Sequence, residues 1–462
     1  MTEVERLAGF VERAAYEAIP ASAREHLKIR VLDALACAIG AIDGGPVALI
    51  RDHVTDLGGS PQCALIGGGR IAPDRAALFN GALVRYLDFN DSYLAPGETC
   101  HPSDNLAAVL AAAELAGRGG AELLTALAVA YQVQCRLSDE APVRDKGFDH
   151  VTHIAYAAAA GVAKALGLDP GATANAVAIA GTAFNALRVT RTGALSHWKG
   201  LAAPHAASGA LHAALLARRG VTGPAEVFEG NKGFQEAIAG PYTIDWDAEG
   251  LDRAERTVIK RYNAEIHSQA TIEGVLELKR EHGIDPGRIE RIEIDTFDVA
   301  YHIIGGGEEG EKKTIRTKEE ADHSLPYMVA VALLDGAVLP AQYEEERIGR
   351  EDVQSLLRRV EVRPDEAYSR RFPAEMPCRI GIAMADGRRF EAEKRDYEGF
   401  TIRPARWETV AAKFESLAEP FAAACVRREI VEVVAGLERR PVADLMKELA
   451  KVRVPPRELK EE

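Results

Sequence analysis

The sequence between residues 87 and 105 begins with Leu87-Asp88-Phe89-Asn90-Asp91 and ends with His101-Pro102-Ser103-Asp104-Asn105. These two polar blocks lie between alanine-rich segments with helical spacing, where a packed helical domain normally has only a few turn residues. Gathering ionisable side chains there is unfavourable unless they pair with one another or bind a ligand. Pro102 also predicts a helix start with Ser103 or Asp104 as N-cap. The exposed backbone N–H groups at that helix start would favour a carboxylate ligand. We therefore expect a functional site at this joint of a helical fold.

Helical spacing dominates the chain up to about residue 220. Alanine, leucine, isoleucine and valine recur three and four positions apart in residues 23–42, 104–117 and 121–135, a pattern typical of amphipathic helices. Because many of these positions are alanine, the helices can approach one another closely. The sequence therefore predicts a compact helical bundle.

The pattern changes after about residue 285. Short segments with strand character follow at residues 289–294, 360–362, 379–384 and 388–394. The last two flank Asp386-Gly387, a strong hairpin signal, and residues 324–335 predict a buried helix between the strands. Helical spacing returns from Trp407. The simplest interpretation is an α+β domain inserted into a helical bundle that the C-terminal segment rejoins.

Composition narrows the function classes. The chain has 462 residues, 47% hydrophobic and 27% charged, which predicts a globular protein with two domains. Its formal net charge of -14 argues against nucleic acid or an anionic membrane surface as a partner. It leaves an anionic substrate open, because a local group of arginines and lysines can dominate a pocket.

Several features predict a cytoplasmic protein. The six cysteines are scattered without a CxxC pair, which suits reduced thiols and offers no local iron–sulfur motif. Glu3 and Glu5 precede any apolar run, so the N-terminus does not resemble a signal peptide. No apolar stretch reaches the roughly 18 residues that a membrane-spanning helix needs. We expect no membrane association.

The polar blocks also carry a resemblance to the MmgE/PrpD family, and within it to the branch that dehydrates 2-methylcitrate. Further blocks resemble those of the family and follow in the family's order, so that the resemblance extends over most of the chain. They are 147–151 (GFDHV), 198–200 (WKG), 263–269 (NAEIHSQ) and 321–327 (ADHSLPY). The resemblance implies a mainly α-helical bundle domain with an inserted smaller α+β lid domain. The expected limits are 1–268 for the first helical part, 269–398 for the lid and 399–462 for the second helical part. It also implies a homodimer formed through the helical domain.

The activity that this resemblance implies is that of a hydro-lyase. Such an enzyme would eliminate water from 2-methylcitrate to give 2-methyl-cis-aconitate in propionate catabolism, without a metal or other cofactor. Citrate is an expected side substrate, since losing one methyl contact costs only about 1–3 kcal/mol. Two departures, Asn263 where proline is common and Ser324-Leu325-Pro326, leave the branch open. The alternatives on the same fold are cis-aconitate decarboxylase and iminodisuccinate epimerase; a decarboxylase would carry histidine at the position of Glu265.

Dehydration of a tricarboxylate needs a base for a carbon-bound proton, an acid for the leaving hydroxyl, and cations that hold the carboxylates. The residues expected to be catalytic are Asp88, His101, His150 and Lys199. Those expected to bind substrate are Asp91, Ser92, Arg188, Arg191, Lys260, Arg261, Glu265 and His267. The resemblance to the related decarboxylase branch places Asp88, Ser92, His101, His150, Lys199 and Lys260 in the pocket lining.

Structural interpretations compete with several of these assignments. Asp88 can pair with Arg85 one turn away, and His153 can fill the role given to His150. Glu265 and His267 can be packed helix residues, while His323, after Asp322, is expected to orient the lid.

Two wider alternatives also stay open. Asp88, Asp91, His101 and Asp104 could bind Mn²⁺ or Fe²⁺, although their spacing matches no recognised helix metal site. A helical scaffold that binds a protein partner would explain the alanine-rich faces. It leaves the polar clustering without a reason.

Overall fold

A computed structural model describes residues 1–455 of the chain. The described residues form two compact units. Unit 1 contains Met1–Arg188, Gly200–Thr257 and residues 406–455. Unit 2 contains Val189–Lys199 and Val258–Ala405. Unit 1 therefore draws on both ends of the described chain.

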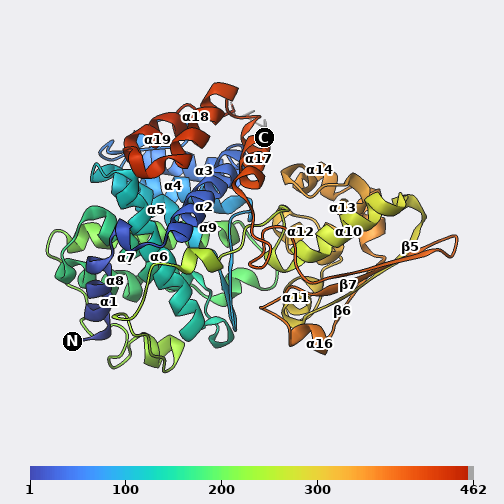
Figure 1. Ribbon diagram of the computed structural model, residues 1–462, viewed down its shortest axis with the longest axis horizontal. Coiled ribbons are helices and arrows are strands. Elements are labelled where there is room, and N and C mark those ends of the chain that lie inside the picture. Colours follow the sequence, from blue (N-terminus) through green and yellow to red (C-terminus); the bar gives the residue numbers. More distant parts are fainter. Residues whose placement is uncertain (456–462) are drawn as a thin grey trace. The chain divides into compact units, whose positions relative to one another are not determined.

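Unit 1 is mainly helical (Figure 1). Its α-helices are α1 (Glu3–Arg13), α2 (Ala21–Gly40), α3 (Gly45–Leu57), α4 (Pro73–Tyr86), α5 (Leu106–Leu115), α6 (Gly120–Glu140), α7 (Val151–Leu166), α8 (Pro170–Ala183), α9 (Trp198–Ala217, whose Trp198 and Lys199 count with unit 2), α17 (Trp407–Ala418), α18 (Ala424–Ala435) and α19 (Val442–Leu449). Its strands form two short hairpins, β1 (Cys63–Ala64) with β2 (Arg70–Ile71) and β3 (Tyr93–Ala95) with β4 (Glu98–Cys100). The predicted helical bundle is confirmed.

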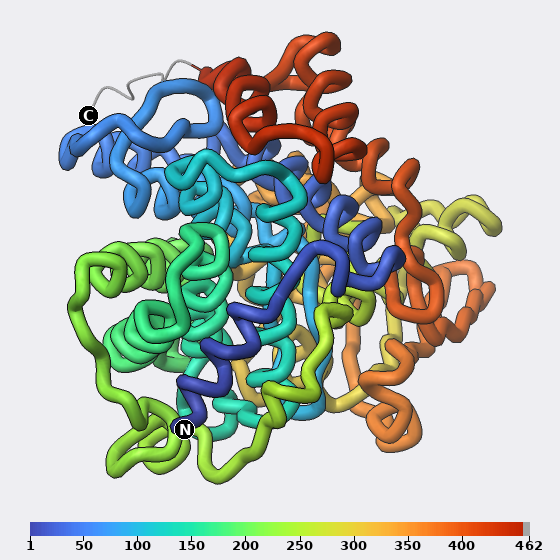
Figure 2. Tube along the Cα trace, turned by 60° about the vertical axis from the view of Figure 1, so that its left-hand side comes forward, coloured from blue at the N-terminus to red at the C-terminus, as the bar shows by residue number. Residues whose placement is uncertain are grey.

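Small residues set the packing of this unit. A Cβ at Gly161 of α7 would lie 2.9 Å from Cβ of Ala130 and 3.0 Å from the carbonyl oxygen of Ala126, so glycine lets α7 approach α6 closely. Helix α2 is buried along most of its length and contacts α4, α17 and α18. Figure 2 shows the C-terminal helices (red) beside this N-terminal helix (blue). The C-terminal segment thus packs into the N-terminal bundle, as the returning helical spacing predicts.

Unit 2 is built on a four-stranded sheet in the order β6-β5-β7-β8. Its strands are β5 (Ile289–Thr296), β6 (Val360–Pro364), β7 (Cys378–Met384) and β8 (Arg389–Lys394). Strand β5 runs parallel to β6 and antiparallel to β7. Gly387 closes the predicted β7–β8 hairpin at φ 84°. The four strand predictions are confirmed.

Helices pack on this sheet (Figure 1): α10 contacts β7 and β8, and α13 contacts β6. The α-helices of unit 2 are α10 (Gln269–His282), α11 (Asp298–Ala300), α12 (Lys318–Ala321), α13 (Leu325–Asp335), α14 (Glu345–Ile348), α15 (Glu351–Leu357) and α16 (Glu366–Ser369). Helix α13 matches the buried helix predicted at residues 324–335.

Short helical turns connect these elements. The 3₁₀ turns are η1 (Tyr16–Ala18), η2 (Pro102–Asn105), η3 (Arg144–Lys146), η4 (Arg188–Arg191), η6 (Arg253–Arg256), η7 (Ile266–Ser268), η8 (Pro286–Arg288), η10 (Pro340–Tyr343) and η11 (Leu437–Arg439), and the π turns are η5 (Gln235–Ala239) and η9 (Tyr301–Gly305). All six cysteines are free thiols. No single helix among residues 1–455 has the length and apolar content to cross a membrane, although the bent pair α2 and α3 passes that test together.

Candidate active site

The residues predicted for the site fall into two groups, one in each unit. Unit 1 holds Asp88, Asp91, Ser92, His101, His150 and Arg188. Unit 2 holds Arg191, Lys199, Lys260, Arg261, Glu265 and His267.

Asp88 follows the end of α4 in an unusual backbone conformation. Its φ is 55°, in the left-handed region that residues with a Cβ rarely adopt. One carboxylate oxygen accepts a hydrogen bond from Nη1 of Arg85 at 2.6 Å, and both side chains are buried. Nε of Arg85 lies 3.6 Å from Oδ2 of Asp104. The alternative of an ion pair with Arg85 is therefore realised, and the guanidinium supplies the positive charge that a metal would bring to these carboxylates.

The carboxylate of Asp91 is fully buried and bound by protein groups. Oδ1 accepts from the N–H of Ser103 at 3.0 Å, and Oδ2 accepts from the hydroxyl of Tyr131 at 2.8 Å. Burial raises the pKa of Asp91, and the hydrogen bonds from Ser103 and Tyr131 oppose that rise. The carboxylate expected at the helix start near Pro102 is thus that of Asp91, a residue of the chain itself.

The predicted N-cap is wrong. Ser103 and Asp104 lie within the turn η2, and neither side chain caps a helix. Instead, the amide of Asn90 donates to Oγ of Ser103 at 2.9 Å and to Oδ1 of Asp104 at 3.0 Å. These bonds join the two polar blocks across the β3–β4 hairpin.

His101 has a defined tautomer in its neutral form. Its Nδ1 lies 2.7 Å from the carbonyl oxygen of Asp91 and 3.1 Å from Oγ of Ser92. A carbonyl oxygen only accepts, so Nδ1 carries the hydrogen and the lone pair of a neutral ring lies on Nε2. The ring meets that of His150 edge to face, with centroids 5.3 Å apart. The structure thus brings these two predicted histidines together.

A buried carboxylate lies beside His150. Oδ1 of Asp149 is 3.2 Å from Nδ1 of His150 and also accepts from the N–H of Val151. Nη1 of Arg188 lies 3.8 Å from Oδ2 of the same carboxylate. Asp149, which the sequence-based list omitted, therefore links two of the predicted site residues.

His153 has a structural environment. Its Nε2 is 2.9 Å from the carbonyl oxygen of Ala141, and its Nδ1 is 3.4 Å from Oγ of Ser138. Burial lowers the pKa of His153 to about 4, so the ring is neutral near pH 7. In unit 1, His150 and not His153 faces His101.

A second carboxyl group with an altered pKa lies on β4. Burial, reinforced by the nearby charge of Asp149, raises the pKa of Glu98 to about 7. Its Oε2 accepts from the backbone N–H groups of Val143 and Arg144, at 3.2 and 3.1 Å. Glu98 therefore ties the β3–β4 hairpin to the loop that precedes His150.

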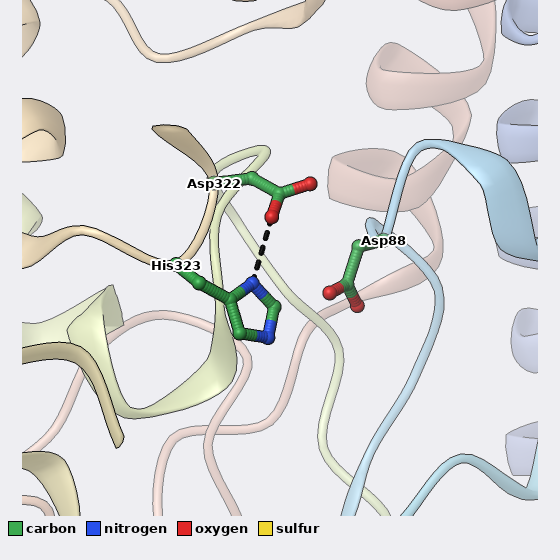
Figure 3. A group of neighbouring side chains, drawn as sticks. All are labelled: Asp88, Asp322 and His323. Atoms are coloured by element: carbon green, nitrogen blue, oxygen red, sulfur yellow. Dashed lines mark hydrogen bonds and ion pairs between the residues drawn. The ribbon is translucent and has the colours of Figure 1, made fainter. Parts of the chain in front are cut away.

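In unit 2, Lys199 belongs to a buried triad. Its Nζ is 2.5 Å from Oδ1 of Asp322 and 2.9 Å from Nδ1 of His323. A hydrogen bond of 2.7 Å joins Nδ1 of His323 to Oδ1 of Asp322, drawn as a dashed line in Figure 3. Nζ of Lys318 lies 2.7 Å from the other carboxylate oxygen of Asp322. Burial alone would raise the pKa of Asp322, but the ammonium groups of Lys199 and Lys318 hold it well below its usual range.

Glu265 and His267 form a second acid–histidine pair in unit 2. Glu265 precedes η7 and accepts from both the backbone N–H and Nδ1 of His267, at 2.8 and 2.7 Å. Although burial alone would raise it, the pKa of Glu265 is lowered to about 2, chiefly by His267. The His267 ring packs against Phe297 and Phe372. Among residues 1–455, no hydrogen-bond partner reaches its buried Nε2.

The remaining predicted cations differ in burial. Lys260 is 1% exposed and its charge helps to lower the pKa of Glu265. Arg191 is also buried. The Arg261 side chain, by contrast, is 42% exposed and lies 3.6 Å from Glu398. Lys260 and Arg191 are therefore better placed than Arg261 to act in a dry pocket.

Asp149 and Asp322, which were not among the predicted site residues, share a feature of the sequence. Asp149 and Asp322 each directly precede a histidine and lie within hydrogen-bonding or ion-pair distance of it. The two Asp-His dipeptides are visible in the sequence. Treating each as a carboxylate that orients an imidazole would have identified both.

Comparison with known proteins gives a consistent result. The MmgE/PrpD N-terminal domain matches residues 5–247, and the MmgE/PrpD C-terminal domain matches residues 262–439. The 2-methylcitrate dehydratase of Salmonella typhimurium is 29% identical, with 78% of each chain covered. That of Cupriavidus necator is 30% identical over 77% of each chain. An alkylcitrate dehydratase from a fungal species is 28% identical over 84% of this chain and 82% of its own.

Proposed function

We propose, on the premise that this chain belongs to the MmgE/PrpD family, that it is a hydro-lyase that eliminates water from 2-methylcitrate. The product would be 2-methyl-cis-aconitate, in propionate catabolism, with citrate as a second substrate. The observation that carries the proposal is the pair of histidines, His101 and His150, whose rings meet at 5.3 Å with different partners on their Nδ1 atoms. The two relatives named 2-methylcitrate dehydratase support the choice of substrate.

We infer different tasks for the two imidazoles from their different partners. The carboxylate of Asp149 offsets the positive charge of a protonated His150, whereas His101 faces a neutral carbonyl. Two adjacent imidazoles resist being charged together. We therefore assign His101, through Nε2, as the base that removes the carbon-bound proton, and His150 as the acid that protonates the leaving hydroxyl. Each such group typically contributes about 10²- to 10⁴-fold to the rate.

Other unit 1 residues support this proton transfer in the proposal. Ser92 keeps a hydroxyl beside His101. Asp91, whose carboxylate oxygens are bound by protein groups, acts on His101 through its carbonyl. Asp88 presents a carboxylate that Arg85 holds in place, and we retain it among the catalytic residues.

Binding a tricarboxylate requires positive charge, because proton removal next to a carboxylate adds further negative charge. We assign this role to the predicted cations: Lys199, Lys260, Arg188, Arg191 and Arg261. Arginine can hold a carboxylate through two hydrogen bonds, and lysine acts as a point charge. Lys199 also faces His323 and Asp322, so it can shift between these partners and substrate. Glu265 and His267 complete the proposed contacts.

The proposal includes the further expectations from the sequence. These are a metal-independent reaction and a cytoplasmic homodimer formed through the helical domain. Along the sequence, the proposed lid at residues 269–398 separates helical parts at 1–268 and 399–462. Mass measurement in solution tests the dimer, and a monomer would contradict it.

In the decisive assay, purified, chelator-treated protein is incubated with 2-methylcitrate, citrate or cis-aconitate. The products are identified by NMR. A His101→Ala variant should lose dehydration. His53→Ala, which removes an exposed histidine on α3, should keep it. Release of carbon dioxide from cis-aconitate would instead indicate a decarboxylase. Iminodisuccinate is supplied in a further incubation, in which its epimerisation would indicate an epimerase. If neither the wild-type protein nor the His101→Ala variant acts on any substrate, and the substitution changes only thermal stability, the result would favour a protein-binding scaffold.

A further inference from the structure

A buried lysine on the C-terminal helix α17 reaches the first polar block. Nζ of Lys413 donates to Oδ1 of Asp33 on α2 at 2.7 Å and to the carbonyl oxygen of Phe89 at 2.7 Å. It also lies 3.6 Å from the centroid of the Phe89 ring, within range for a cation–π contact. The side chains of Lys413 and Asp33 are 6% and 1% exposed. This ammonium group therefore has a backbone partner inside the proposed site in addition to its ion pair.

Phe89, whose carbonyl oxygen Lys413 binds, directly follows a residue in an uncommon backbone conformation. Asp88 has φ 55°, and a residue with a Cβ persists there only when its surroundings impose the conformation. Arg85 holds the Asp88 side chain at 2.6 Å. Lys413 binds the carbonyl oxygen of Phe89, the next residue along the chain. These contacts restrain the carboxylate of Asp88 and the backbone of the residue that follows it.

We propose that Lys413 is a positioning residue for the dehydration: by binding the carbonyl of Phe89 it keeps Asp88 in the left-handed conformation that orients its carboxylate. This inference rests on the proposed function, in which Asp88 is catalytic. It gives the C-terminal segment a role in the reaction, since 324 positions separate Lys413 from Phe89 in the sequence.

The test must separate positioning from stability. Lys413→Met alone would leave the Asp33 carboxylate buried without its cation and would destabilise the fold. The double variant Asp33→Asn/Lys413→Met carries neither charge and should recover much of that stability. If Lys413 positions Asp88, the double variant should still show kcat lowered by about 100-fold, the scale of a misplacement near 1 Å, with KM changed by less than about 3-fold.

Lys28 offers a matched control. It is another buried lysine, on α2, with ion pairs to Glu25 and Glu438 and a hydrogen bond to the carbonyl oxygen of Ala435. Lys28→Met should lower the melting temperature and leave kcat unchanged. A double variant at positions 33 and 413 with wild-type kcat would overturn the positioning role.

A crystal structure of the double variant supplies a readout that does not need activity. We expect Asp88 to leave positive φ, or the Phe89 carbonyl to turn away from residue 413. An unchanged backbone at Asp88 and Phe89 would also overturn the inference. If the wild-type protein dehydrates none of the substrates, the proposed function fails, and this structural readout still decides whether Lys413 imposes the conformation.

Discussion

The imidazole rings of His101 and His150 lie with their centroids 5.3 Å apart and their planes at 72°. Nδ1 of His101 meets a carbonyl oxygen, and Nδ1 of His150 meets the carboxylate of Asp149. Two chemically similar side chains thus have unequal electrostatic surroundings. In the proposed reaction, this inequality lets His101 serve as the base and His150 as the acid.

Separate roles for the rings predict different defects. In D₂O, a His150→Gln variant should lose dehydration by about 10²- to 10⁴-fold yet still exchange the carbon-bound proton of the substrate for deuterium. His101→Gln should lose both reactions. NMR of recovered substrate measures the exchange. If His150→Gln loses exchange as completely as His101→Gln, the assignment of base and acid is wrong.

Asp149→Asn should lower kcat by more than about 10-fold, because the imidazolium of His150 loses the carboxylate that offsets its charge. The pH profile should also move: the alkaline limb, on which activity falls as His150 loses its proton, should shift to lower pH. Activity measured between pH 5 and pH 9 tests this. A purely structural role for Asp149 would lower the melting temperature and leave the profile in place.

Glu98 makes stability depend on pH. The folded protein holds the Glu98 proton up to a pH of about 7, whereas the ordinary value is 4.5, so folding takes up a proton between these values. Raising the pH through this window should therefore lower the free energy of unfolding, by at most about 3 kcal/mol. Glu98→Gln should flatten this slope in urea titrations at pH 5 and pH 8. Glu3, whose pKa burial also raises to about 7, should leave a residual slope. An unchanged slope would contradict the prediction.

Asp322→Asn should destabilise unit 2 by about 3–5 kcal/mol, because Lys199 is buried and loses its carboxylate partner. The control is Arg370→Met on α16, which breaks an exposed pair with Glu366 and should cost at most about 1 kcal/mol. Denaturant unfolding measures both changes. Equal effects would mean that the buried triad contributes no more than a surface pair.

Treatment with EDTA should leave the dehydration rate unchanged. The carboxylates of Asp88 and Asp104 already have the guanidinium of Arg85 between them, with distances of 2.6 and 3.6 Å. A metal ion there would meet repulsion from that cation. Loss of activity on chelation, restored by Mn²⁺ or Fe²⁺, would refute metal independence.

Local patterns were sufficient for most elements. The spacing of apolar residues predicted α2, α6 and α13, and alternation predicted β5, because burial of one face imposes those periods. The chemistry of the site was also visible, since LDFND and HPSDN place ionisable groups at a joint where they need partners. The N-cap at Ser103 failed because Asn90, from the other block, binds that side chain.

The sequence by itself determined the family, the mainly helical character and the residue types of the candidate site. Tertiary structure decided which partner each of them has: Lys413 reaches Phe89 across 324 positions, and Lys199 reaches Asp322 across 123. Periodicity records which face of an element is buried, but not which distant element covers it. The partner of a buried charge is set by that packing, and so is the difference between His101, which meets a carbonyl, and His150, which meets a carboxylate.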